Sequence, residues 1–84
     1  MGATAGPVRF NWRKAAHQAD GLEVTMYGAI HCHAWTTGEW KVIHGTAVLA
    51  HWSEQSKGSN INEAKQRAQG AAIVQLQLLQ SPNT

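Results

Sequence analysis

Hydrophobic and polar residues alternate with a period of two up to about residue 54, and the period then becomes helical. Alternation is typical of strands that bury one face, because successive side chains point to opposite sides. A repeat of about 3.6 residues is typical of a helix with one buried stripe. The order of these patterns predicts an antiparallel sheet followed by a single helix.

The first alternating segment spans residues 8–14 and predicts an edge strand. Its apolar face holds Val8, Phe10 and Trp12, and its polar face holds Arg9, Asn11 and Arg13. For residues 15–21 a short helical turn and a loop both remain open, with Asp20-Gly21 as the strongest turn signal.

Alternation resumes over residues 22–35 and predicts one long strand, with Gly28 as a bulge or bend within it. One side carries Leu22, Val24, Met26, Gly28, Ile30, Cys32 and Ala34, and the other carries Glu23, Thr25, Tyr27, Ala29, His31, His33 and Trp35. Residues 36–39 predict a hairpin turn in which Gly38 takes a positive φ. A return strand over 38–44 places Trp40 and Val42 on one face, and a last strand over 46–54 follows Gly45.

The last periodic segment predicts a helix from about Ile61 to about Gln80, ended by Ser81-Pro82. Asn60 is a favourable N-cap, and Glu63 three residues later completes a pattern that resembles a capping box. The expected apolar stripe consists of Ile61, Ala64, Ala68, Ala71, Ala72, Leu76 and Leu79.

These elements predict an α+β fold: an antiparallel four-stranded meander sheet packed on one face by a single C-terminal helix. We expect one domain over residues 1–84, with flexible tails at 1–7 and 81–84. The second sheet face has no cover in this plan, and uncovered apolar surface usually marks an interface. The side chains expected there are Tyr27, His31, His33, Trp35 and one of Trp40 or Trp52.

Composition narrows the class of protein. The chain has 84 residues, 43% of them hydrophobic and 14% charged, which indicates one small folded core. A net charge of +2 excludes a dense basic patch. The single cysteine, Cys32, allows no intramolecular disulfide and favours a reducing, cytoplasmic compartment. Neither a signal peptide nor a membrane span is evident.

The histidines are the first candidates for chemistry. His31 and His33 point the same way from one strand, about 6–7 Å apart at Cα, so they could share a metal ion. Cys32 points away and is expected to be a small buried residue, so a metal site would need His17, His44, His51 or a carboxylate. We favour a histidine pair without metal on an aromatic surface. Without a nucleophile or phosphate-binding motif, the sequence predicts a non-enzymatic protein that needs no cofactor.

Nucleic-acid binding is the alternative. Arg9, Arg13 and Lys14 lie on the first strand, and exposed aromatic rings stack on bases. Three strands, a Gly/Ser loop and the helix opening Glu63-Ala64-Lys65 also resemble the C-terminal part of a double-stranded-RNA-binding domain. That family has two lysines where this chain has Ile61 and Asn62.

A second resemblance covers about residues 8–75. It is based on three motifs: Phe10-Asn11-Trp12, Gly38-Glu39-Trp40-Lys41-Val42 and Glu63-Ala64-Lys65-Gln66-Arg67-Ala68. They resemble small phage- or prophage-encoded accessory proteins, and the resemblance implies a non-catalytic protein that binds and inhibits a host macromolecule such as a CRISPR effector. It transfers no binding residues. From the residues themselves we expect partner contacts at Arg9, Arg13, Tyr27, His31, His33 and Trp35, with a homodimer also open.

Overall fold

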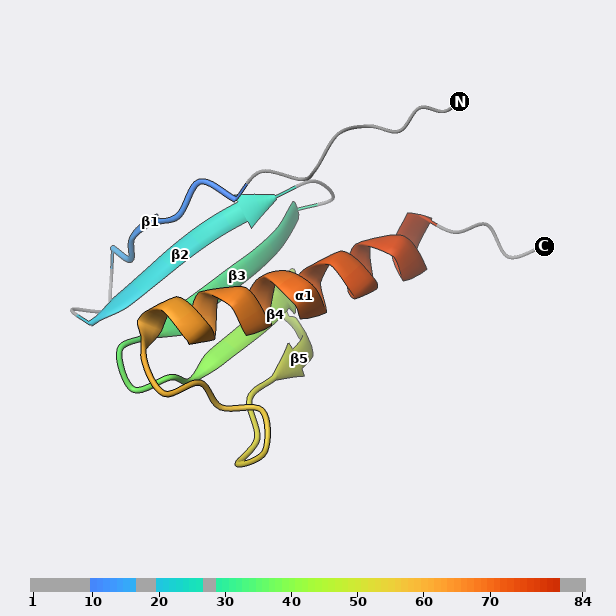
Figure 1. The fold of residues 1–84 in the computed structure, drawn as a ribbon. Helices are drawn as coiled ribbons and strands as arrows, with labels where there is room; N and C mark the ends of the chain where they lie inside the picture. The colour runs from blue at the N-terminus through green and yellow to red at the C-terminus, as the bar shows by residue number, and fades with distance from the viewer. Residues whose placement is uncertain (1–9, 17–19, 27–28, 81–84) are drawn as a thin grey trace, which may run out of the picture.

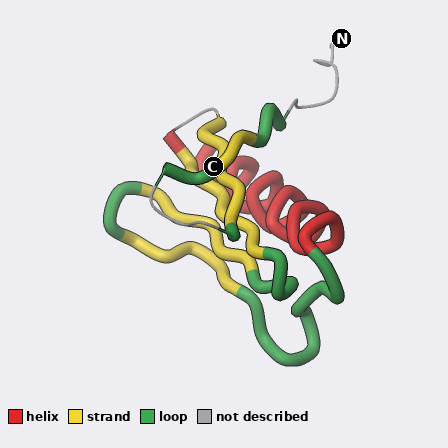
Figure 2. Tube along the Cα trace, turned by 90° about the vertical axis from the view of Figure 1, so that its left-hand side faces the viewer, coloured by secondary structure: helices red, strands yellow, loops and turns green. Residues whose placement is uncertain are grey.

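The computed structural model describes residues 10–16, 20–26 and 29–80, and it has the predicted α+β architecture. Five strands form one antiparallel meander, and a C-terminal helix packs on one of its faces (Figure 1). The elements are β1 (Arg13–Lys14), β2 (Gly21–Met26), β3 (Ile30–Trp35), β4 (Trp40–His44), β5 (Ala47–His51) and α1 (Ile61–Gln80). A perpendicular view shows the two layers, with the helix on one side of the strands (Figure 2). The expectations for residues 1–7 and 81–84 lie outside the described residues.

The predicted strand over residues 22–35 is wrong: the chain reverses within it, and the halves are β2 and β3. Met26 pairs with Ile30, so three residues form the connection, and among them Ala29 has a φ of 61°. Paired residues share a face of an antiparallel sheet. Because Met26 and Ile30 are an even number of positions apart, the alternation continues in phase through the reversal. The pattern of residue types therefore hides this turn.

The edge strand is present but much shorter than predicted. Within the described residues 10–14, only Arg13 and Lys14 pair with β2, opposite Glu23 and Leu22. The residues just before them pack on the other layer: the Trp12 ring contacts the core, and its Nε1 donates to Gln69 Oε1 of α1 at 2.6 Å. The chain therefore leaves the sheet edge because Trp12 finds its partner on the helix. Val8 and Arg9 lie outside the described residues.

The last two strands follow their predicted turns. Gly38 and Gly45 both have positive φ, at 95° and 66°. β5 is shorter than the predicted strand over 46–54, and its pairing with β4 shifts between Val42 and Ile43. This bulge leaves Leu49 as an extra residue of β5, next to the Ala50 that pairs with Val42. Leu49 and Ala50 are both half-buried against the core.

The core lies between α1 and one face of the sheet. Its strand side chains are Val24, Met26, Ile30, Cys32, Ala34, Trp40 and Val42, and its helix side chains are Ala64, Ala68, Ala72 and Leu76. The small alanines let α1 lie close to the strands. Trp40 is only 6% exposed, and its Nε1 donates to the Ser56 carbonyl at 2.9 Å. Trp40 therefore does not lie on the uncovered face, because its indole has an apolar site and a hydrogen-bond acceptor here.

The start of α1 is capped largely as predicted. The Glu63 backbone N–H donates to Asn60 Oδ1 at 3.0 Å. The Glu63 carboxylate, however, accepts from the backbone N–H and hydroxyl of Ser59, one residue before the expected position. Hydrogen bonds from Ser59 lower the pKa of Glu63 below its usual value.

A backbone contact holds the segment before α1 against the sheet. The Gly58 N–H donates to the Gly38 carbonyl at 2.9 Å. A Cβ on Gly38 would overlap the Gly58 carbonyl group, and a Cβ on Gly58 would overlap Glu63 at the start of α1. The β3–β4 turn and the start of the helix are therefore fixed to each other.

The C-terminal end of α1 extends beyond the strands (Figure 1). Twenty helical residues span about 30 Å, whereas strands of five or six residues span about 17–20 Å. Leu79, expected in the buried stripe, is consequently 51% exposed. In the described part of the chain, α1 is not both long and apolar enough to cross a membrane.

Candidate binding face

The face of the sheet opposite α1, called the open face below, carries the side chains that alternate with the core residues. Strand register arranges them in two rows. The first row is Arg13, Glu23, His33, Lys41 and His51, and the second is Thr25, His31, Ile43 and Val48. Trp35 lies beside the first row, at the end of β3. The open face therefore combines an aromatic ring with charged, polar and aliphatic groups.

Trp35 is half-buried and has two polar neighbours. The His33 ring stacks on it with centroids 6.0 Å apart and planes 18° from parallel. Lys41 Nζ lies 5.8 Å from the centroid of the ring, within the range of a cation–π contact. These contacts hold a large amphipathic side chain in place before any partner binds, which reduces the entropic cost of binding.

His33 is a partly desolvated histidine in the middle of the open face. Its Nδ1 is buried and has no hydrogen-bond partner among the described residues. Burial lowers the pKa of His33, and the positive charge of Lys41 lowers it further, while Glu23 opposes the shift. His33 is therefore a neutral imidazole at pH 7.

His31 lies on the same face in a different setting. It is exposed, and its Nδ1 shares a 2.8 Å hydrogen bond with Thr25 Oγ1. The two histidines point the same way, as predicted. Among the described residues, no three histidine, cysteine or acidic side chains are grouped so that they could hold a metal ion.

Cys32 lies between these histidines in the sequence but points into the core. It is fully buried, as predicted. Burial raises the pKa of its thiol to about 12, so the thiol remains protonated at neutral pH. A protonated, inaccessible thiol is neither a nucleophile nor a metal ligand.

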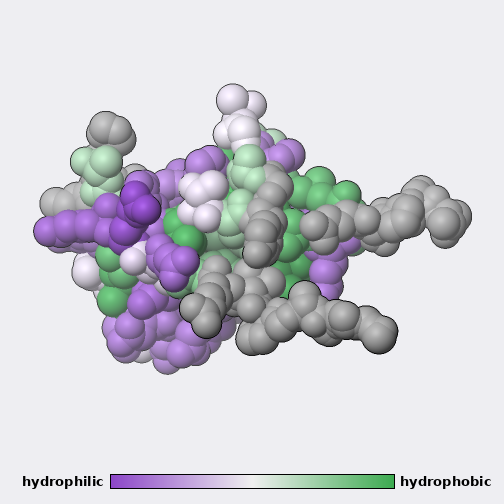
Figure 3. Space-filling view, turned by 90° about the horizontal axis from the view of Figure 1, so that it is seen from above, coloured by the Kyte–Doolittle hydropathy of each residue, from purple (hydrophilic) through white to green (hydrophobic). Residues whose placement is uncertain are grey.

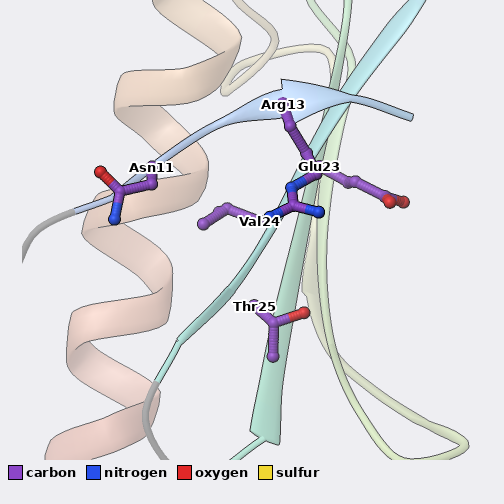
Figure 4. A pocket seen from close by; sticks show the side chains of 5 residues that line it. All are labelled: Asn11, Arg13, Glu23, Val24 and Thr25. Carbon is purple, nitrogen blue, oxygen red and sulfur yellow. The ribbon is translucent and has the colours of Figure 1, made fainter. Parts of the chain in front are cut away.

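A hollow lies where the chain before Arg13 leaves β2. Its volume is about 290 Å³, and its lining residues are Asn11, Arg13, Glu23, Val24 and Thr25. In Figure 4 the Arg13 side chain extends along β2, and the Glu23 carboxylate points away from it. The hollow gives the open face a polar recess beside its shortest strand.

The structure brings together most of the predicted contact residues. His31, His33 and Trp35 share the open face, and Arg13 joins them from β1. Arg9 and Tyr27 lie outside the described residues. Trp52 packs against the core with Lys57 Nζ 5.7 Å from its ring, so it does not join the face either.

Two neighbours of these residues were not predicted as contacts. Lys41 reaches Trp35 from β4, and Glu23 lies opposite His33 on β2. Alternation with the buried Trp40 and Val42 indicates that Lys41 faces outward. Its proximity to Trp35 depends on strand register, which the pattern does not specify.

The fold and this face define an α+β protein with a five-stranded meander, covered by a helix on one side. Comparisons of the chain with protein-family models, curated proteins and solved structures gave no match.

Proposed function

We propose that the chain is a non-catalytic binding module whose open face binds a partner protein. The observation that carries the proposal is Trp35, which is half-exposed on the face opposite the helix and is held by His33 and Lys41. Tryptophan is the residue type most often responsible for large losses of affinity when an interface side chain is truncated.

The surroundings of Trp35 suit a protein surface. Ile43 and Val48 add apolar area, and Val48 is 54% exposed. The row with Arg13, Glu23 and Lys41 lies between Trp35 and these aliphatic side chains and supplies charges of both signs. Protein–protein interfaces usually combine aromatic and aliphatic contacts with polar groups in this way.

The partner's identity remains a prediction from the sequence. The resemblance to phage accessory proteins suggests a host defence protein such as a CRISPR effector. The lone, reduced cysteine suggests that the encounter takes place in the cytoplasm.

Replacing Trp35 tests the proposal. The immobilised chain and its Trp35→Ala variant would be exposed to the same lysate, and the retained proteins quantified by mass spectrometry. We expect a specific partner to fall at least about tenfold with Trp35→Ala, as for an interface hot spot, while the melting temperature changes little. Leu79→Ala, which removes exposed apolar area from α1, is the matched control. Equal retention by wild type and Trp35→Ala would exclude the open face as the contact.

Nucleic-acid binding is the second candidate, because Arg13 and Lys41 share a row with two histidines beside Trp35. Affinity for a short RNA duplex and a single strand would be measured between about 50 and 200 mM salt. Phosphate contacts predict a steep fall in affinity, and Arg13→Gln should reduce the logarithmic slope by about one. Arg67→Gln on the helix is the control. A salt-independent affinity, or none, rejects this candidate.

A further inference from the structure

The C-terminal part of α1 leaves three large apolar side chains exposed. Leu76 faces the core and Ile73 is half-buried, but Val74, Leu78 and Leu79 are 52%, 65% and 51% exposed. From Gly70 to Gln80 there is no charged residue. Figure 3 shows hydrophobic surface gathered on its right-hand side, where α1 extends beyond the strands. Contiguous exposed apolar side chains usually mark a contact with another molecule.

Two of these exposed side chains face the β5 side of the molecule. Gln69 bonds to Trp12 and so faces the β1 side. At about 100° per residue, Val74 and Leu78 lie about 140–180° around the helix from Gln69. Ala72 faces the core, and Gly70 and Val74 lie about 200° around the helix from it. The exposed side chains therefore face away from the sheet and towards its β5 side.

Gly70 has no role within the described part of the chain. It is exposed in the helix, its φ is not positive, and a Cβ placed on it meets no atom within 4 Å. Glycine in a helix costs about 1 kcal/mol relative to alanine. Gly70, Val74 and Leu78 follow one another at intervals of four, so they form a single row along the exposed flank.

We propose that this row binds a second copy of the chain, with the two α1 helices antiparallel about a twofold axis at Val74. In such a pair Val74 meets its own counterpart, and Leu78 of each copy lies over Gly70 of the other. Leu78, the largest exposed side chain of the row, thus meets Gly70, which has no side chain.

Two features favour a second copy over an unrelated protein. The row is complementary to itself when reversed, as an isologous contact requires. The absence of charge from Gly70 to Gln80 means that no like charges meet when the helices are antiparallel.

The size of the contact sets its expected strength. Eleven helical residues span about 16 Å, so the exposed row offers a footprint of a few hundred Å² per copy at most. Stable complexes bury about 600–1,000 Å² per partner. We therefore expect a weak dimer, with a dissociation constant on the order of 100 µM.

Sedimentation equilibrium of the full chain between about 10 µM and 1 mM tests the dimer. We expect the mean mass to rise from 9.1 kDa towards twice that value. Leu78→Glu should keep the protein monomeric throughout this range. Asn62→Glu adds the same charge at exposed Asn62, at the other end of α1 and on the side of Gln69, and should behave like wild type.

Gly70→Ala separates association from helix stability. Removing the glycine should raise the melting temperature of the dilute monomer, because alanine favours the helix. The same change should weaken dimerisation at least about threefold, because a methyl group fills the site of Leu78. A purely conformational role for Gly70 would not alter the dissociation constant.

Three results would overturn the proposal. The first is a mass that stays at 9.1 kDa up to 1 mM, which would mean that the row does not bind a second copy. The second is a dimer unaffected by Leu78→Glu, which would place the contact elsewhere. The third is growth beyond the dimer, which a closed twofold contact does not permit.

Discussion

The two faces of the sheet are made from alternate residues of the same strands, yet they differ in almost every physical property. Towards α1, Ile30, Cys32 and Val42 are completely buried, and every core side chain is apolar. On the open face, the intervening His31, His33 and Lys41 keep contact with water. His31 shares a hydrogen bond with Thr25, and His33 and Lys41 both contact Trp35. The covered face is thus completed within the chain, whereas the open face combines groups suited to another molecule. Stability and recognition should accordingly respond to different substitutions.

We expect the largest difference between the faces when the losses in the free energy of unfolding caused by Ile30→Ala and Ile43→Ala are compared. Ile30 is fully buried under α1, and Ile43 is half-exposed on the open face. We expect Ile30→Ala to lower the free energy of unfolding by about 2–5 kcal/mol, because it leaves a cavity. Ile43→Ala should cost less than half as much in the same urea titration. Equal losses would mean that the open face is packed as tightly as the core.

Gly38→Ala tests what fixes the helix on its face. The new methyl group would overlap the Gly58 carbonyl in a residue whose φ is 95°. We expect a loss of about 2–4 kcal/mol in the free energy of unfolding. Gly45→Ala is the matched control: its φ is 66°, but its Cβ meets no atom within 4 Å. If both variants lose the same amount in thermal melts, backbone strain rather than the contact with Gly58 is responsible.

Asn60→Ala should have a smaller effect, confined to the start of α1. It removes the acceptor for the Glu63 N–H. We expect a loss of about 1 kcal/mol in the free energy of unfolding, typical of an N-cap. Asn62→Ala, within the first turn, should be neutral or slightly stabilising by the same urea titration, because alanine has the higher helix propensity. A cost at Asn62 as large as at Asn60 would contradict the capping role.

The smallest expected effect is a pH dependence from the open face. The pKa of His33 is lower in the folded protein than the usual value of about 6.5, so the unfolded chain takes up a proton more readily. The contribution of His33 to the free energy of unfolding should therefore fall as the pH drops through about 6.5 towards the folded pKa. His33→Gln should remove this part of the pH dependence in chemical denaturation at pH 5–8. The same replacement at exposed His51 is the control, and an unchanged profile in His33→Gln would assign the dependence to other groups.

Residue alternation predicts which face each side chain occupies, but it does not predict where a strand ends. It places Val24, Met26, Cys32 and Ala34 together on the covered side, and the structure confirms this arrangement. It misses the reversal between Met26 and Ile30, since an odd number of connecting residues preserves the phase. It also extends the first strand over Trp12, because no pattern shows that the indole bonds to Gln69, 57 residues later.

In the candidate site, too, alternation predicts which side chains share a face but not which ones come into contact across strands. His31, His33 and Trp35 are predictable because they lie two residues apart along one strand. Lys41 comes to Trp35 across a hairpin, and only the register of β3 against β4 brings them within 5.8 Å. The exposure of Leu79 depends on the lengths of the strands relative to α1, which a helical period does not contain.

Every strand of the sheet pairs with the strand that precedes it in the chain, and the helix follows the last of them. The contacts that build the sheet are consequently local, and low contact order is associated with rapid folding. During synthesis each hairpin has its partner available as soon as its second strand emerges from the ribosome. The helix emerges after all the strands, so the apolar side of the nascent sheet remains without its permanent cover until α1 has been synthesised.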